Sequence, residues 1–186
     1  MESRSSHGSF NLQSQSGMSL LETMIAVAVL LIATVGIMAI AMVATSTTEN
    51  QGHLAARTAE YAQDKMEQLI SLAYGDSTTD TTVFPANNSG GTGLSVGGSS
   101  DPDAPVTSPG TGYVDYLDRS GNPLPVSGGT APANWYYIRV WQISTPSGTS
   151  NLKQITVTAK VRSGVGSTGI GALPQSTLVT LKTNPF

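Results

Sequence analysis

The sequence predicts an α+β protein in which one long amino-terminal helix packs against a carboxy-terminal antiparallel β-sheet. Residues 23–44 form an uncharged and almost wholly apolar run, close to the roughly 20 residues that a helix needs to cross a hydrocarbon core. Residues 135–182 contain three segments rich in β-branched and aromatic residues, separated by turns that contain Gly and Pro. That second pattern is typical of short paired strands.

The composition narrows the classes of function. The chain has 186 residues with a net charge of −3, no cysteine and two histidines. One domain with an anchor is therefore the expected organisation. The lack of cysteine excludes disulfides and thiolate metal ligands, and the slightly acidic charge gives no reason to expect nucleic acid as a partner. We expect no catalytic residues, no cofactor and no metal site.

A lone acid lies at the beginning of the apolar run. Residues 1–17 are polar and lack the positively charged region of an ordinary secretory signal. Glu22 follows just inside the apolar segment, where an ionised carboxylate at membrane depth costs about 2.5–3.5 kcal/mol. Such a residue indicates a functional site, and its partner has to be found.

The residues around this acid, Gly17-Met18-Ser19-Leu20-Leu21-Glu22, resemble the class III signal of type IV pilins and of type II secretion pseudopilins. The resemblance implies that a prepilin peptidase cleaves between Gly17 and Met18 and that the new amino terminus, Met18, is N-methylated. Residues 1–17 are then a cleaved leader, and Glu22 is the acid at the fifth position of the mature chain. The absence of proline from the apolar segment points towards a minor pilin or a pseudopilin.

The physical reading of Glu22 agrees with this resemblance. A free Met18 ammonium can pair with the Glu22 carboxylate of a neighbouring subunit, which would satisfy both charges and fix the axial register of a filament. The resemblance implies a bacterial inner-membrane protein that crosses the membrane once, with its body outside the cytoplasm. It then enters a filament through its helix, and other pilin or pseudopilin subunits are its partners.

Two alternatives remain open at this stage. The chain could be a minor pseudopilin of a type II secretion system rather than a minor pilin of a pilus. It could also be a membrane-anchored extracytoplasmic binding module, in which residues 75–134 bind the partner and Glu22 lies at the membrane interface. That module would keep its leader and tolerate the change Glu22→Gln.

Residues 18–44 are expected to be the membrane and filament-core half of the helix, and residues 45–74 its soluble half. In the soluble half, apolar residues recur at spacings of three and four, which predicts an amphipathic helix. Charged residues, among them Asp64 and Lys65, are assigned to the solvent side, and Gly75 is expected to end the helix. The predicted core stripe consists of Ala55, Ala59, Ala62, Met66, Leu69 and Ala73.

Residues 75–134 are rich in Gly, Ser, Thr and Pro and are predicted to form a long loop region with a short strand around residues 113–117. Residues 93–97 match the G-x-S-x-G elbow and residues 164–169 match G-x-G-x-x-G, but neither lies in the strand–helix context that its chemistry requires. Asp101, Asp103, Asp115 and Asp118 lack the spacing of an EF-hand, so they are predicted to be solvated loop carboxylates.

The last segment, residues 135–186, is predicted to be an antiparallel meander. Strands are expected over residues 135–143, 153–161 and 178–182, with turns at 146–149 and 163–171. Apolar and polar residues alternate in the second strand, which predicts one buried face. This pattern also resembles the carboxy-terminal sheet of minor pilins.

Overall fold

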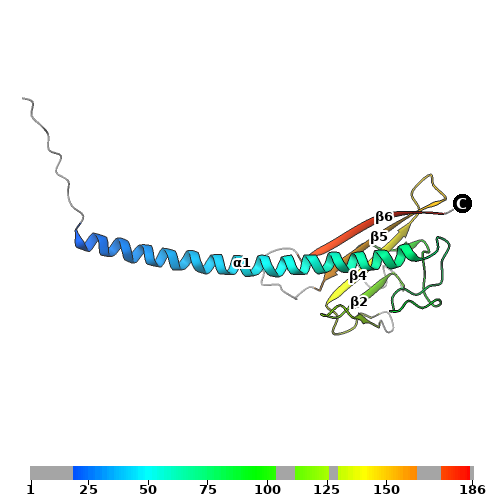
Figure 1. Cartoon of the computed structure of the whole chain (residues 1–186), viewed down its shortest axis with the longest axis horizontal. Helices are drawn as coiled ribbons and strands as arrows, with labels where there is room; N and C mark the ends of the chain where they lie inside the picture. Colours follow the sequence, from blue (N-terminus) through cyan, green and yellow to red (C-terminus); the bar gives the residue numbers. More distant parts are fainter. Residues whose placement is uncertain (1–18, 104–111, 126–129, 163–172, 185–186) are drawn as a thin grey trace, which may run out of the picture. The chain divides into compact units, whose positions relative to one another are not determined.

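The computed structural model describes residues 19–103, 112–125, 130–162 and 173–184. One helix, α1 (Leu20–Ser71), precedes a six-stranded antiparallel sheet, so the predicted α+β class is confirmed (Figure 1). The predicted leader at residues 1–17, Met18 and the predicted turn at 163–171 lie outside the described residues. The six strands are β1 (Gly97–Gly98), β2 (Val114–Leu117), β3 (Pro123–Leu124), β4 (Tyr137–Ser144), β5 (Leu152–Val161) and β6 (Gln175–Thr183).

The chain divides into two compact units, with the boundary after Thr45 inside α1. The first unit contains the apolar half of α1, which is long and apolar enough to cross a membrane. The second unit, residues 46–186, contains the rest of α1 and the whole sheet. Among the described residues, all the buried ones lie in this second unit, which we call the body.

The body half of α1 contacts the sheet through a row of residues that overlaps the predicted stripe only in part. Ala62, Met66 and Leu69 are buried as predicted, whereas Ala55, Ala59 and Ala73 are exposed. The buried face also includes Thr58, Tyr61 and Lys65. The face is rotated because large side chains, rather than small alanines, fill the space between helix and sheet.

The helix ends at Ser71, three residues before the predicted end. Its carboxy-terminal turn contains no basic residue of its own, and two lysines from the sheet supply the missing donors. Lys182 of β6 donates to the carbonyl of Ile70, and Lys153 of β5 donates to the carbonyl of Tyr74 at 2.7 Å. Cations at this end of a helix satisfy free carbonyls and favour the helix dipole.

The strand order is β3-β2-β4-β5-β6, and β1 pairs with the end of β4 beyond β2. The predicted meander of the last three strands is therefore confirmed. The register places Trp141 opposite Val157 and Val157 opposite Leu178. Residues 75–134, predicted to be mainly loop, contribute the three short strands β1, β2 and β3 to the same sheet.

The two faces of the sheet have different apolar clusters. The face towards α1 holds the main core, in which Trp141 and Ile155 are fully buried. The opposite face holds a smaller cluster formed by Val114, Tyr116, Ile138 and Val140. The prediction of one buried face for the second meander strand is wrong for the middle of β5, because Thr156 and Thr158 on its other face are buried as well.

The segment between α1 and β1 is held by its own hydrogen bonds. Asp76 accepts hydrogen bonds from the backbone N–H groups of Thr78 and Thr79, and the carboxylate also accepts from the Thr79 hydroxyl at 2.6 Å. Leu94 closes the segment by inserting fully into the core. This arrangement explains how a Gly- and Thr-rich stretch stays attached to the body.

Candidate functional site

The sequence predicts its functional residues at the beginning of α1. Gly17 and Met18 lie outside the described residues, so the structure does not place the predicted cleavage site. Glu22 lies in the first turn of α1, where its backbone N–H donates to the Ser19 carbonyl at 2.9 Å. Its side chain is exposed, and a negative charge in the first turn of a helix is favoured by the helix dipole.

The apolar half of α1 buries none of its side chains within the chain. Every large apolar side chain between Leu20 and Val43 is between 55% and 80% exposed. An apolar surface this continuous does not stay in water in a soluble monomer. By length and composition this segment could cross a membrane.

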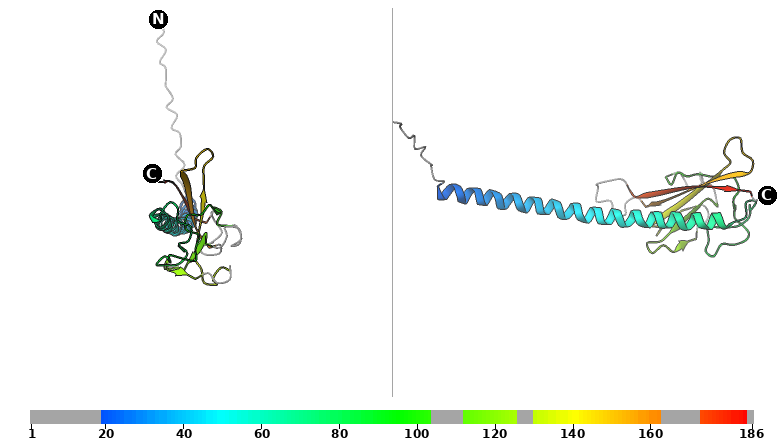
Figure 2. Two further views of the ribbon diagram at one scale, coloured as in Figure 1. Left: turned by 90° about the vertical axis from the view of Figure 1, so that its right-hand side faces the viewer. Right: turned by 45° about the horizontal axis from the view of Figure 1, so that its top comes forward.

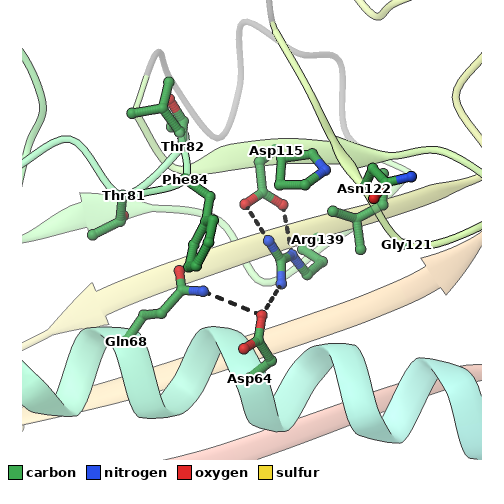
Figure 3. Close-up of a pocket in the computed structure, with 12 residues that line it drawn as sticks. Asp64, Gln68, Thr81, Thr82, Phe84, Asp115, Gly121, Asn122 and Arg139 are labelled. Atoms are coloured by element: carbon green, nitrogen blue, oxygen red, sulfur yellow. Dashed lines mark hydrogen bonds and ion pairs between the residues drawn. The ribbon is translucent and has the colours of Figure 1, made fainter. Parts of the chain in front are cut away.

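A second group of charged residues lies inside the body. Asp115 on β2 and Arg139 on β4 are directly opposite each other in the sheet, and both side chains point towards α1. The Arg139 Nε and Nη2 atoms donate to the two Asp115 carboxylate oxygens at 2.7 and 2.8 Å. Arg139 Nη1 donates to Asp64 on α1 at 2.8 Å (Figure 3).

Lys65 completes this group from the helix. Its ammonium lies 2.7 Å from Asp115 Oδ2 and donates to the Thr81 carbonyl at 2.5 Å and to Gln68 Oε1 at 3.0 Å. It also lies 4.7 Å from the centre of the Trp141 ring. The sequence placed Lys65 on the solvent side and Asp115 in a solvated loop, and both predictions are wrong because the two residues neutralise each other in the core.

The electrostatics of this cluster favour the charged forms of Asp115 and Arg139 but not that of Lys65. Burial alone raises the pKa of Asp115, but Lys65 and Arg139 outweigh burial and bring the pKa below its usual value of 3.8. Burial lowers the pKa of the Lys65 ammonium, and the neighbouring Asp115 counteracts part of that effect. The positive charges of Lys65 and Arg139 balance the negative charges of Asp64 and Asp115. Asp64 is the only largely exposed member of this cluster. The ammonium of Lys65 has three acceptors within the body, namely Asp115, Thr81 and Gln68.

A cavity of about 290 Å³ adjoins the exposed side of this cluster. Figure 3 shows Phe84, Thr81 and Thr82 on one side of it and Asn122 with Gly121 on the other. Its accessible charge is that of Asp64, because Asp115 and Arg139 are buried and paired. Among the described residues, those that line the cavity include no cysteine, histidine or serine.

The structure adds no support for a catalytic role of the two motif matches found in the sequence. Ser95 follows a turn and precedes the two-residue strand β1, and no helix follows it among the residues that the structure describes. The G-x-G-x-x-G match at 164–169 lies outside the described residues. In the part of the chain that the structure describes, no three His, Asp or Glu residues come together in a way that could hold a metal ion. Asp103 pairs with Lys160, and Asp118 accepts hydrogen bonds within its own turn.

The sequence contained a signal for the buried cluster that its motifs did not reveal. Arg139 alternates with Ile138 and Val140, so it shares one face of β4 with Trp141. A charged residue on the same face as a large aromatic residue indicates a buried ion pair. The partners of Arg139 could not be found this way. Asp64 lies on α1, and Asp115 lies opposite Arg139 because β2 pairs with β4, which only the fold establishes.

We compared the chain with known proteins to test the resemblance. No protein-family model, no curated protein and no solved structure matches it.

Proposed function

We propose that this chain is a minor pilin, a structural subunit of a type IV pilus-like filament that assembles through its amino-terminal helix. The observation that supports this best is the apolar half of α1. Its large apolar side chains between Leu20 and Val43 are all more than half exposed, and Glu22 is the only charged residue in the apolar sequence. The same helix continues into the body, where Tyr61 and Leu69 pack on the sheet.

In this proposal the protein is first a single-pass protein of the bacterial inner membrane with its body outside the cytoplasm. A prepilin peptidase cleaves between Gly17 and Met18, and Met18 is N-methylated. The protein is a substrate of that peptidase and catalyses nothing itself. On assembly, the Met18 ammonium of one subunit pairs with Glu22 of a neighbour, so neither charge enters the apolar filament core alone.

Two other functions are compatible with the same helix. A minor pseudopilin of a type II secretion system would use the same processing and the same charge pairing in a different machine. A membrane-anchored binding module would use only the anchor. The exposed Phe84 beside the 290 Å³ cavity is the feature that favours such a module, because an exposed aromatic beside a hollow is a common binding anchor.

The decisive experiment measures the intact mass and the amino-terminal sequence of the membrane-extracted protein. The full chain is produced with and without a prepilin peptidase. A start at Met18 that depends on the peptidase, with the added mass of one methyl group, supports the filament class. A start at Met1 in both samples overturns it and leaves the anchored module.

A second measurement separates the two machines. Deletion of the gene for this protein in its own host should reduce the amount of filament that can be sheared from the cell surface if the protein is a minor pilin. It should instead reduce secretion of folded exoproteins, with filaments intact, if it is a pseudopilin.

A further inference from the structure

A second cavity, of about 540 Å³, lies where the body half of α1 passes the beginning of β4. Figure 2 shows this half of the helix lying along the sheet. A volume of this size is typical of small-molecule sites. The lining comes from α1, from the turn after β2 and from the start of β4, and it includes His53, Leu54, Arg57, Arg119, Tyr136 and Tyr137. All of these residues belong to the body, and we call the hollow the Arg57 cavity.

The charges that line the Arg57 cavity are basic. Arg57 and Arg119 carry guanidinium groups and His53 carries an imidazole, and among the described residues no Asp or Glu lines the cavity. The whole chain has a net charge of −3, so the cavity is a local excess of positive charge on an acidic protein. A hollow lined by one sign of charge raises the local concentration of ions of the other sign.

Neither arginine is held by a strong partner. Arg57 pairs with Glu60 at 3.4 Å, and the two side chains are 42% and 63% exposed, so water screens this pair. Arg119 lies 5.7 Å from the centre of the Tyr136 ring, and no described carboxylate forms an ion pair with it. The carboxylate of the neighbouring Asp118 accepts hydrogen bonds within its own turn. Both guanidinium groups are therefore available to an anion.

The Tyr137 phenol is a buried polar group in the lining of this cavity. The residue is 2% exposed, and the centre of its ring lies 4.8 Å from the ring centres of both Tyr61 and Tyr136. In the described part of the chain, no group forms a hydrogen bond with its hydroxyl. Burial raises the pKa of this phenol, while Arg57 and Arg119 act on it in the opposite direction because both lie close by. The hydroxyl therefore stays protonated and lacks the acceptor that buried hydroxyls normally have.

We propose that the Arg57 cavity binds a small, soluble phosphate monoester. The phosphate group accepts hydrogen bonds from the guanidinium groups of Arg57 and Arg119 and from the Tyr137 hydroxyl. The organic part of the ligand lies against Leu54 and the Tyr136 ring. Every residue of this site belongs to the body, so the inference does not depend on the proposed filament role.

The donors favour a phosphate monoester over other anions. At neutral pH such a group carries about −1.5 to −2 charges and three acceptor oxygens, which match two guanidinium groups and one hydroxyl. A carboxylate carries one negative charge and would leave one guanidinium without a counter-charge. Arginine also binds phosphate oxygens in pairs through its fork of N–H groups. A bare phosphate ion would leave the apolar wall of Leu54 and Tyr136 without a contact, so the ligand has an organic part.

The test measures binding to the full chain in detergent by isothermal titration calorimetry. Phenyl phosphate is the probe, because it joins a phosphate monoester to an apolar ring. Inorganic phosphate lacks the ring, and benzoate keeps the ring but replaces the phosphate by a carboxylate. We expect phenyl phosphate to bind saturably at one site, and each of the other two probes to bind at least about tenfold more weakly.

Two variants and their matched controls locate the site. Arg119→Gln removes an exposed guanidinium and Tyr137→Phe removes only a hydroxyl, and each should weaken the binding of phenyl phosphate about tenfold or more. Lys160→Gln is the control for charge, because it removes a positive charge outside the cavity. Tyr61→Phe is the control for the hydroxyl, because the Tyr61 hydroxyl is also buried without a hydrogen-bond partner among the described residues but Tyr61 does not line the cavity. Both controls should bind like the unchanged chain.

A further arm distinguishes a soluble ligand from the headgroup of a lipid. Phosphatidic acid carries the same phosphate monoester on a lipid, and we expect its addition to the micelle to leave the affinity for phenyl phosphate unchanged. Competition by phosphatidic acid would assign the site to a lipid headgroup and overturn the soluble ligand.

Three other results would overturn the inference. Phenyl phosphate could fail to bind saturably, or benzoate or inorganic phosphate could bind as tightly as phenyl phosphate. The control variants could also lose as much affinity as Arg119→Gln and Tyr137→Phe, which would place the binding outside the Arg57 cavity.

Discussion

The ammonium of Lys65 lies 2.7 Å from a carboxylate oxygen of Asp115, and the two side chains are 0% and 1% exposed. This ion pair joins the middle of the body half of α1 to a short strand of the sheet. Buried ion pairs contribute little net stability, because desolvation offsets their attraction. We infer that this pair fixes the register of α1 on the sheet, since a shift of the helix would leave buried charges without partners.

Replacing Asp115 by Asn should destabilise the body strongly. Lys65 would keep its positive charge in the core without a counter-charge, and Arg139 would keep only the pair with the exposed Asp64, so the expected loss is about 3–5 kcal/mol of unfolding free energy. Asp103→Asn is the matched control, because it breaks the exposed pair with Lys160 and should cost about 0–1 kcal/mol. Urea unfolding of the full chain in detergent, followed by the near-UV signal of Trp141, measures both. Equal losses in the two variants would contradict the assigned role of the buried pair.

The buried cluster around Asp115 should also make the free energy of unfolding depend on pH in the acid range. The pKa of Asp115 lies below 3.8 in the folded state, so the unfolded chain takes up a proton at a pH where the folded carboxylate is still charged. This contribution to stability is complete above about pH 4 and is lost as the pH falls through the folded pKa. The stability difference between the unchanged chain and the Asp115→Asn variant should therefore shrink as the pH falls below about 4. A difference that stays constant down to about pH 2 would contradict this explanation.

Gly121, in the turn after β2, should be costly to replace. Its φ angle is +90°, and a Cβ placed on it would lie 2.5 Å from the Tyr61 hydroxyl. Gly121→Ala should cost about 1–2 kcal/mol for the backbone conformation and about 1–3 kcal/mol more for displacing Tyr61. Tyr61 cannot yield easily, because it packs edge-on against Tyr137.

Gly148→Ala is the control for Gly121. Its φ angle is +81°, but a Cβ there meets nothing within 4 Å, so only the backbone cost should appear. The thermal unfolding midpoints of the two variants separate the cost of the backbone conformation, which both variants share, from the cost of the contact with Tyr61, which only Gly121→Ala has. Identical midpoints would show that Tyr61 moves aside without cost.

Glu22→Ala tests the charge pairing in the proposed filament. The variant should be cleaved normally between Gly17 and Met18, because the peptidase acts before assembly. It should then fail to enter filaments, because the Met18 ammonium of a neighbour would be buried without its carboxylate. Amino-terminal sequencing and the amount of subunit in sheared filaments measure the two steps. Normal incorporation would remove the charge-pairing argument.

The sequence by itself determined the elements whose signals are local. The apolar run at 23–44 and the spacing of Ala62, Met66 and Leu69 predicted α1, and the alternating segments after residue 135 predicted β4, β5 and β6. Each of these patterns repeats with the period of its own secondary structure, so no distant contact is needed to recognise it. The motif at Gly17–Glu22 is equally local, and what it predicts for processing stays a prediction.

Only the tertiary structure decided which charged residues are buried. Lys65 and Asp115 look like surface residues in a sequence, because their burial depends on partners 50 and 24 positions away in the chain. Arg139 brings the two together only after β2 has paired with β4 and α1 has packed across both. The cost of burying a charge is offset by contacts between segments that lie far apart in the chain, and no pattern along the chain records them.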